Sequence, residues 1–194
     1  GKSVLDLCAA PGGKTLQLLS KGAKVTSVDK SETRLKKLRQ NLQRMGREAT
    51  IISEDVLTFK PDELYDAILL DAPCSATGTL RRHPDLMMLK DNDSIKSLLE
   101  LQKNILHHAF QFLKPNGILI YCVCSLEHEE GQDQIKTFLK EHPNASRANI
   151  SNDELGDLND LNIIEGDVLI FPTSLAEEGG ADGFFISRLT KHKE

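Results

Sequence analysis

Short apolar runs alternate along the chain with longer stretches in which apolar residues recur every three or four positions. The runs are typical of buried strands, and the longer stretches are typical of amphipathic helices. The first pair is a strand over Ser3 to Cys8 and a helix over Lys14 to Ser20, joined by a glycine-rich turn. A second strand over Val25 to Asp29 precedes a helix that Ser31 caps and Gly46 ends.

The same alternation continues to the end of the chain. We expect further strands over Ala49–Ser53, Ala67–Leu70, Ile118–Val123, Asp167–Phe171 and Phe184–Leu189, and further helices over Ser94–Leu113 and Glu127–Glu141. Lys114–Gly117 predicts a turn, and Gly131 weakens the last helix by about 1 kcal/mol relative to alanine. The polar stretch 145–162 fits neither pattern, and the glycine-rich stretch 178–183 joins the last two strands directly.

Strands that alternate with helices predict an α/β fold, with a mostly parallel twisted sheet and helices on both of its faces. The two closing strands have no helix between them and predict an antiparallel C-terminal hairpin. Open sheets of this kind bind ligands at the carboxyl ends of their strands, where the strand order reverses. We therefore expect the ligand crevice between the first and fourth strands.

Composition limits the setting in which this fold works. The 194 residues suit one domain, and 39% hydrophobic with 27% charged residues is ordinary for a globular protein. Since we find no apolar run of membrane-spanning length and no signal peptide, we expect a cytoplasmic protein without a membrane contact, and a monomer. The net charge of −5 argues against a domain that binds nucleic acid by charge alone. The first strand begins almost at Gly1, so we expect a piece of a longer protein that lacks an N-terminal region.

Two predicted strands end in reactive side chains. The fourth strand runs into Asp71 and Cys74, with Pro73 holding the loop extended between them. The fifth strand ends at Cys124 and should lie beside the fourth, so Cys74 and Cys124 should face each other across the crevice. Metal binding is the alternative for this pair, but no histidine or further cysteine stands at ligand spacing, so we expect no metal.

The remaining cysteines, Cys8 and Cys122, are expected to be small buried apolar residues, and all four thiols to be reduced. His128-Glu129-Glu130 lacks the second histidine of a helical zinc site, and we interpret it as a solvated helix start. Basic side chains concentrate near the predicted crevice in one loop, at Arg81, Arg82 and Lys90. They are either RNA phosphate contacts or an ordinary charged loop.

The glycine turn at the first strand points to a nucleoside cofactor. Gly12 to Thr15 suggests a P-loop, but that motif needs glycine at position 8, where this chain has Cys8. The turn also lacks the spaced glycines of a dinucleotide site. A nucleoside without a pyrophosphate fits better, and Asp29 at the end of the second strand could accept both ribose hydroxyls or simply cap a helix. Asp55 holds the equivalent place after the third strand, and both roles are open for it as well.

Two long motifs carry a resemblance to a known family. They are Asp-Leu-Cys-Ala-Ala-Pro-Gly-Gly-Lys-Thr at 6–15 and Asp-Ala-Pro-Cys-Ser-Ala-Thr-Gly at 71–78, together with the Cys-Ser that begins at Cys124. The chain resembles the RNA cytosine-5 methyltransferases that use S-adenosylmethionine. Through Arg-Arg-His-Pro-Asp at 81–85 and Gly-Ala-Asp-Gly-Phe-Phe at 180–185, it is most similar to the bacterial Sun/Fmu branch, which modifies 16S ribosomal RNA.

The resemblance implies a Rossmann-like class I methyltransferase fold, with residues 1–194 as the catalytic domain and the family's N-terminal RNA-binding region absent. It implies Cys124 as the nucleophile that adds to cytosine, Cys74 as an aid to product release, and Asp71 near both cofactor and target base. The residues implied to bind S-adenosylmethionine are Cys8, Ala9, Ala10, Pro11, Gly12, Gly13, Lys14, Asp29, Asp55 and Asp71.

Other functions remain as alternatives. Val123 stands where the family usually has threonine, which suggests an RNA-binding or assembly factor that keeps the cofactor pocket without turnover. A tRNA cytosine-5 methyltransferase is a second alternative. An exocyclic-amine methyltransferase typically carries Asn/Asp-Pro-Pro-Tyr after the fourth strand, and the sequence from Asp71 to Cys74 does not match it.

Overall fold

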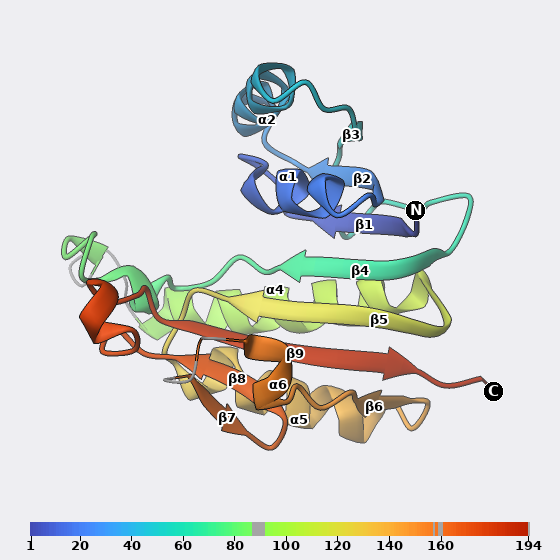
Figure 1. The fold of residues 1–194 in the computed structure, drawn as a ribbon. Coiled ribbons are helices and arrows are strands. Elements are labelled where there is room, and N and C mark those ends of the chain that lie inside the picture. Colours follow the sequence, from blue (N-terminus) through green and yellow to red (C-terminus); the bar gives the residue numbers. More distant parts are fainter. Residues whose placement is uncertain (87–91, 157, 159–160, 194) are drawn as a thin grey trace.

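The computed structural model describes residues 1–86, 92–156, 158 and 161–193 and shows one sheet of nine strands with helices on both faces (Figure 1). The strands are β1 (Ser3–Leu7), β2 (Lys24–Asp29), β3 (Thr50–Ser53), β4 (Tyr65–Asp71), β5 (Leu113–Val123), β6 (Ala145–Arg147), β7 (Asn162–Ile164), β8 (Asp167–Ile170) and β9 (Phe184–Lys191). The helices are α1 (Gly13–Ser20), α2 (Glu32–Arg44), α4 (Asn92–Gln111), α5 (Gln132–Glu141) and α6 (Asn152–Leu155), with 3₁₀ turns η1 (Thr77–Thr79), η2 (His128–Glu130) and η3 (Ala176–Glu178).

The strand order is β3-β2-β1-β4-β5-β9-β8-β7, with β6 paired to β9. Strands β1 to β5 pair in parallel, whereas β9 runs antiparallel to β5 and to β8. This confirms a mostly parallel sheet with an antiparallel C-terminal hairpin. The carboxyl ends of the parallel strands share one edge, and Figure 1 shows both chain termini at the opposite edge. The order reverses at β1, between β2 and β4, as expected for the crevice.

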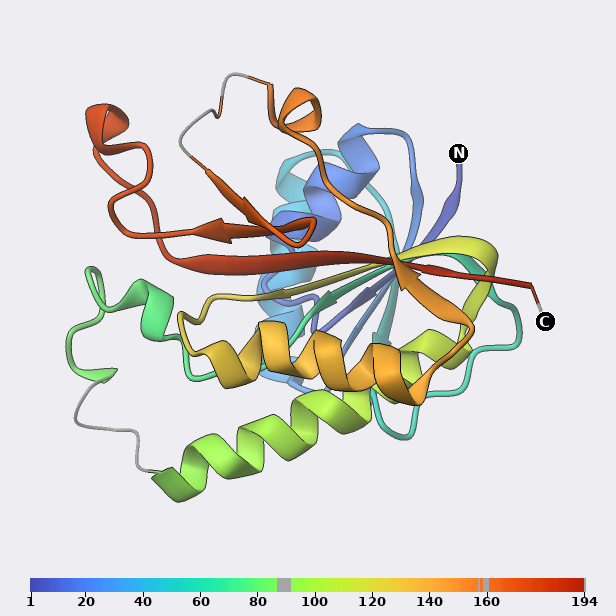
Figure 2. The same ribbon diagram turned by 90° about the horizontal axis from the view of Figure 1, so that it is seen from below.

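Two apolar layers hold the helices to the sheet. On one face, Leu35, Leu38 and Leu42 of α2 pack against the turn that follows β1. On the other face, α4 and α5 lie side by side (Figure 2) and pack, through residues such as Phe110 and Phe138, in the core cluster that also contains the strand residues. The apolar positions of these helices recur at helical spacing, so one stripe of each helix is buried. Among the described residues, no helix is long and apolar enough to cross a membrane.

The structure corrects the region between the fourth and fifth strands. Helix α4 ends at Gln111, and β5 begins at Leu113 rather than at Ile118. Tyr65 pairs with Leu113 and Ala67 with Ile118, so the register shifts and residues 114–117 have no ladder partners on β4. The predicted turn is therefore a bulge inside a longer strand.

The predicted helix over Glu127–Glu141 is divided in two. A 3₁₀ turn, η2, precedes Gly131, and only then does α5 begin. A Cβ atom at Gly131 would lie 2.8 Å from the Phe185 ring, so only glycine lets the chain pass this close to β9. The unassigned stretch 145–162 contributes β6, α6 and the start of β7.

Candidate active site

The turn after β1 is shaped by two residues with left-handed backbone conformations. Cys8 has φ 59°, so β1 ends at Leu7, one residue earlier than predicted, and Gly12 has φ 99°. A Cβ atom on Gly12 would lie 2.8 Å from Leu38 Cγ, which means that helix α2 packs directly on this turn. The glycine is thus required by close packing as well as by backbone conformation.

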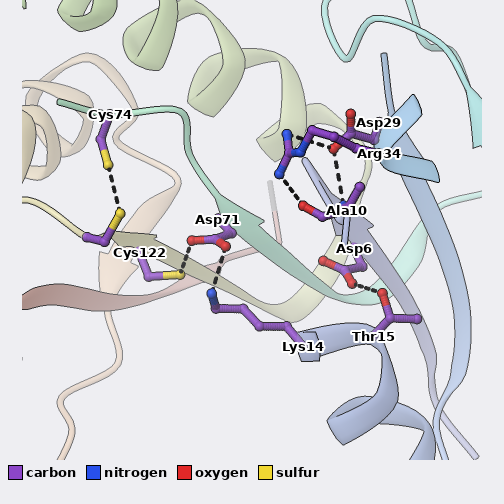
Figure 3. Close-up of polar contacts among 10 residues, drawn as sticks. Asp6, Ala10, Lys14, Thr15, Asp29, Arg34, Asp71, Cys74 and Cys122 are labelled. Atoms are coloured by element: carbon purple, nitrogen blue, oxygen red, sulfur yellow. Dashed lines mark hydrogen bonds and ion pairs between the residues drawn. The ribbon is translucent and has the colours of Figure 1, made fainter. Parts of the chain in front are cut away.

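Asp29 lies at the end of β2 with only 3% of its surface exposed. Its carboxylate accepts hydrogen bonds from the backbone N–H groups of Ala10, at 3.1 Å, and Ser31, at 2.9 Å. Arg34 forms an ion pair with it at 3.3 Å (Figure 3). The carboxylate therefore joins the turn after β1 to the start of α2. This resembles the helix-capping role that we considered as the alternative. The contact of Asp29 with a ribose stays a prediction.

Asp29 and Asp55 nevertheless line one pocket at the carboxyl edge of the sheet. Asp55 also accepts a hydrogen bond from the Leu57 backbone N–H at 3.0 Å and lies 3.7 Å from the Lys30 ammonium. The pocket combines charged groups with apolar walls, which suits a ligand with a flat ring and hydroxyl groups. Its lining residues are Cys8, Asp29, Lys30, Arg34, Asp55, Val56, Pro73, Leu101 and Ile105.

Next to this pocket, Asp71 at the end of β4 is bound from two sides. Lys14 Nζ donates a hydrogen bond of 2.6 Å to its Oδ2 atom, and the Cys122 thiol lies 3.5 Å from its Oδ1 atom (Figure 3). Burial lowers the pKa of Lys14 and the hydrogen bond to Asp71 raises it, with an upward net shift. Lys14 is thus held as a cation that joins α1 to the end of β4.

The two predicted reactive thiols meet as expected. Cys74 lies in the loop after β4, Cys124 follows β5 directly, and their sulfur atoms are 3.4 Å apart. The backbone N–H of Gly78 donates to the Cys124 carbonyl at 3.0 Å, which ties the two loops together. The hydrogen bond from Cys74 lowers the pKa of Cys124, and the same bond together with burial raises the pKa of Cys74. Cys124 is therefore the more acidic thiol of the pair.

The other two cysteines have environments that disfavour a thiolate. Burial raises the pKa of the Cys8 thiol to about 12, and it raises the pKa of Cys122 well above its ordinary value. Cys122 is almost fully buried, as predicted, whereas Cys8 is only half-buried because it lines the pocket. Cys124 is thus the cysteine that is suited to act as a nucleophile.

The interpretation of Glu130 as part of a solvated helix start is wrong. Glu130 is fully buried and accepts hydrogen bonds from Ser75, Ser125 and Gln102. Sequence patterns missed it because its neighbours His128 and Glu129 are exposed and no local periodicity distinguishes it from them.

Asp6 is a second buried carboxyl that sequence reasoning missed. It lies beneath α1, where Thr15 donates a hydrogen bond of 2.5 Å to its Oδ2 atom, while its Oδ1 atom has no hydrogen-bond partner among the described residues. Burial raises its pKa from 3.8 to about 7. An aspartate inside an apolar strand, followed by a threonine in the next helix, is a weak signal for such a pair.

The basic loop is exposed, but one of its arginines has an acidic partner. Arg82 makes a two-point contact with Asp182, with Nε 2.9 Å from Oδ1. Arg81 is exposed, and Lys90 lies outside the described residues. The RNA contact of this loop stays a prediction.

Comparisons with known proteins agree with this geometry. Residues 1–190 match the family described as 16S rRNA methyltransferase RsmB/F. The chain is 41% identical over 197 residues to ribosomal RNA small subunit methyltransferase B of Photorhabdus laumondii, covering 98% of this chain and 42% of that protein. It is 47% identical over 150 residues to the protein of the same name from Vibrio cholerae, covering 75% of this chain and 35% of that protein.

Solved structures show the same fold. The crystal structure of NSun6 from Pyrococcus horikoshii with SFG matches with a TM-score of 0.83 and 28% identity, covering 100% of this chain and 48% of that one. A methyltransferase homolog from the same organism matches with a TM-score of 0.77 and 30% identity, covering 98% and 62% of the two chains. The chain spans less than half the length of the curated relatives above. The extent of the family match and the identity to these relatives show that the chain belongs to the 16S rRNA methyltransferase RsmB/F family.

Proposed function

We propose that this chain is the catalytic domain of a methyltransferase that transfers a methyl group from S-adenosylmethionine to C5 of a cytosine in 16S ribosomal RNA. Membership in the RsmB/F family supports the substrate class. The observation that carries the reaction type is the thiol pair at the sheet edge, with Cys124 Sγ 3.4 Å from Cys74 Sγ and its pKa lowered by that contact.

The side chains that line the pocket beside the thiols suit S-adenosylmethionine in their chemistry. When bound, this cofactor supplies an electrophilic methyl group on a sulfonium centre. Asp29 would hold the ribose, and Asp55, Val56 and Ile105 would surround the adenine, since these residues line a pocket with both carboxylates and apolar walls. The turn from Cys8 to Lys14 would lie along the rest of the cofactor.

Cytosine C5 is a poor nucleophile, and Cys124 overcomes this by covalent catalysis. Its thiolate would add to C6, which makes C5 enamine-like and able to take the methyl group as the S–CH3 bond of the cofactor breaks and S-adenosylhomocysteine leaves. Asp71, held in place by Lys14, would hydrogen-bond near N3 of the base and stabilise the adduct. The C5 proton then leaves to a base, the C6–S bond breaks, and its electron pair returns to Cys124 as thiolate. Cys74, or a base that it positions, would assist this last step.

The RNA must present its cytosine outside the base stack, at a cost of a few kcal/mol that is smallest in loops. With a net charge of −5, this domain is poorly suited to supply the RNA affinity alone. We propose that most of this affinity comes from the additional regions of its longer relatives, and that the reaction takes place in the cytoplasm.

Mapping methylated cytosines by bisulfite sequencing tests the function. Cells that lack the gene encoding this chain should lose a 5-methylcytosine from 16S rRNA and regain it with the wild-type gene, but not with a Cys124→Ala gene. Loss from a tRNA instead would favour the tRNA alternative. An unchanged methylation map with defective ribosome assembly would favour the factor without turnover.

A further inference from the structure

Glu130 is a buried carboxylate that lies beneath both cysteine loops. It ends the 3₁₀ turn η2 after β5 and has no solvent exposure. A buried carboxylate is costly unless several donors surround it. Glu130 Oε1 accepts the Ser75 backbone N–H at 2.8 Å and the Gln102 side-chain amide at 2.9 Å, and Oε2 accepts the hydroxyl groups of Ser75 and Ser125.

Three of these four donor groups come from the two loops that carry the thiols. Ser75 directly follows Cys74, and Ser125 directly follows Cys124. The two serine hydroxyl groups also lie 3.1 Å from each other. One side chain therefore bonds the residue next to each reactive cysteine, and these two residues are 50 positions apart in the chain.

Two further contacts fix Glu130 and its surroundings from outside the loops. Gln102 of α4 also donates to the Pro73 carbonyl at 2.9 Å, next to Cys74. The Tyr121 hydroxyl of β5 donates to the Glu130 backbone carbonyl at 2.7 Å. Glu130 is thus held by a helix and a strand as well as by the two loops, as expected of a residue that supports an active-site geometry.

We propose that Glu130 is a positioning residue that holds the Cys74 thiol against the Cys124 sulfur by joining their two loops through Ser75 and Ser125. The inference builds on the catalytic roles proposed above for the two cysteines. Without the carboxylate, the four donors lose their common acceptor, and the two loops can separate.

The charge of Glu130 also bears on which sulfur keeps the proton. The hydrogen bond to Cys124 and burial raise the pKa of Cys74, and the negative charge of Glu130 adds to this shift. Cys124 receives the hydrogen bond from Cys74, which lowers its pKa, while the charges of Asp71 and Lys14 act on it in opposite directions. The hydrogen bond to Asp182 raises the pKa of Arg82 and the charge of Cys124 adds to this shift, so this guanidinium also lies within the field of Cys124. Loss of Glu130 should raise the pKa of Cys124, because the bond from Cys74 loosens.

Alkylation of the free protein tests this without RNA or cofactor. The rate at which iodoacetamide modifies Cys124, followed by peptide mass spectrometry between pH 6 and 10, reports its thiolate fraction. Because a higher pKa of Cys124 leaves a smaller thiolate fraction, Glu130→Gln should react roughly tenfold more slowly at pH 7. Glu129→Gln is the matched control, because it makes the same charge change at an exposed neighbouring position and should keep the wild-type profile.

Thermal unfolding shows whether Glu130→Gln is folded. If Glu130→Gln does not fold, Ser125→Ala tests the proposal instead, since this change removes one hydrogen bond to the carboxylate and leaves the carboxylate in place. A folded Glu130→Gln or Ser125→Ala protein with the wild-type alkylation profile overturns the proposal, and so does an equal shift in Glu129→Gln. If the alkylation profile shifts as expected but Cys124→Ala still methylates RNA, the positioning role stands and the covalent mechanism fails.

Discussion

At the pocket end of the site, the buried carboxylate of Asp29 is held by groups near it in the chain, whereas at the thiol end the buried carboxylate of Glu130 joins the nearby Ser125 to two distant residues. Asp29 binds the backbone of residues 19 positions before and 2 positions after it. Glu130 binds Ser75, which is 55 positions away. The Asp29 side of the pocket is therefore shaped by two neighbouring strand–turn–helix units, while the thiol pair depends on the assembled sheet. Changes at the thiol end should affect chemistry most, and changes at the pocket end should affect binding.

The largest effect is expected from the two thiols. Cys124→Ala should abolish both methyl transfer and any covalent link to RNA, lowering turnover by roughly 10³-fold or more, because no adduct can form. Cys74→Ala should still attack the base but release it slowly, and so accumulate a protein–RNA conjugate. A denaturing gel of the complete protein with cofactor and substrate RNA separates the two results.

The opposite pattern, with a conjugate formed by Cys124→Ala but not by Cys74→Ala, would reverse the two roles. If neither variant forms a conjugate, covalent catalysis is unsupported. Thermal unfolding of both variants checks that each thiol substitution leaves the protein folded.

The next effect concerns stability at the pocket end, through Asp6. Its pKa is about 7 in the folded protein and 3.8 ordinarily, so the folded state holds the extra proton between these pH values. Stability should therefore fall as the pH rises from 4 to 7, by about 1.4 kcal/mol per unit, and the Asp6 contribution should level off above pH 7. Asp6→Asn should remove this slope.

Urea unfolding at several pH values measures the contribution of Asp6 as the difference in unfolding free energy between wild type and Asp6→Asn. Glu48→Gln, at an exposed position, is the control and should run parallel to wild type. Parallel curves for Asp6→Asn as well would mean that Asp6 is ionised in the folded protein at neutral pH.

The comparison also explains which features the sequence could predict. Periodicity and turn residues are local, so they located the helices, the glycine turn and Asp29, and the strand order then brought Cys74 to Cys124. Glu130 could not be predicted because Ser75 and Gln102 become its neighbours only after the sheet forms. The full length of β5 could not be predicted because its first residue, Leu113, pairs with Tyr65 across a register shift, which no local pattern reveals.

A smaller effect is expected in cofactor binding at the pocket end. Asp29→Ala should weaken binding of S-adenosylmethionine roughly 10- to 100-fold, because hydrogen bonds to a charged group contribute about 1.5–3 kcal/mol. Isothermal titration calorimetry measures the affinity, and thermal unfolding checks that the turn held by Ala10 and Ser31 survives. Glu32→Gln, which removes an exposed carboxylate on the same helix as Arg34, should bind normally. Unchanged affinity of Asp29→Ala would remove Asp29 from the cofactor site.

The smallest effect separates the two arginines of the exposed loop. If both contact RNA, each substitution should reduce the dependence of log affinity on log salt by about 0.7 for a single strand. Arg82 already pairs with Asp182, whereas Arg81 makes no hydrogen bond of this kind among the described residues. We therefore expect Arg81→Ala to lower the salt slope by more than Arg82→Ala, because Arg82 must give up its carboxylate partner to bind a phosphate. Asp182→Asn should release Arg82 and tighten binding slightly. Binding titrations of the complete protein with a 16S rRNA fragment at several salt concentrations measure all three variants, and a salt slope unchanged in every one of them would show this loop to be an ordinary charged surface.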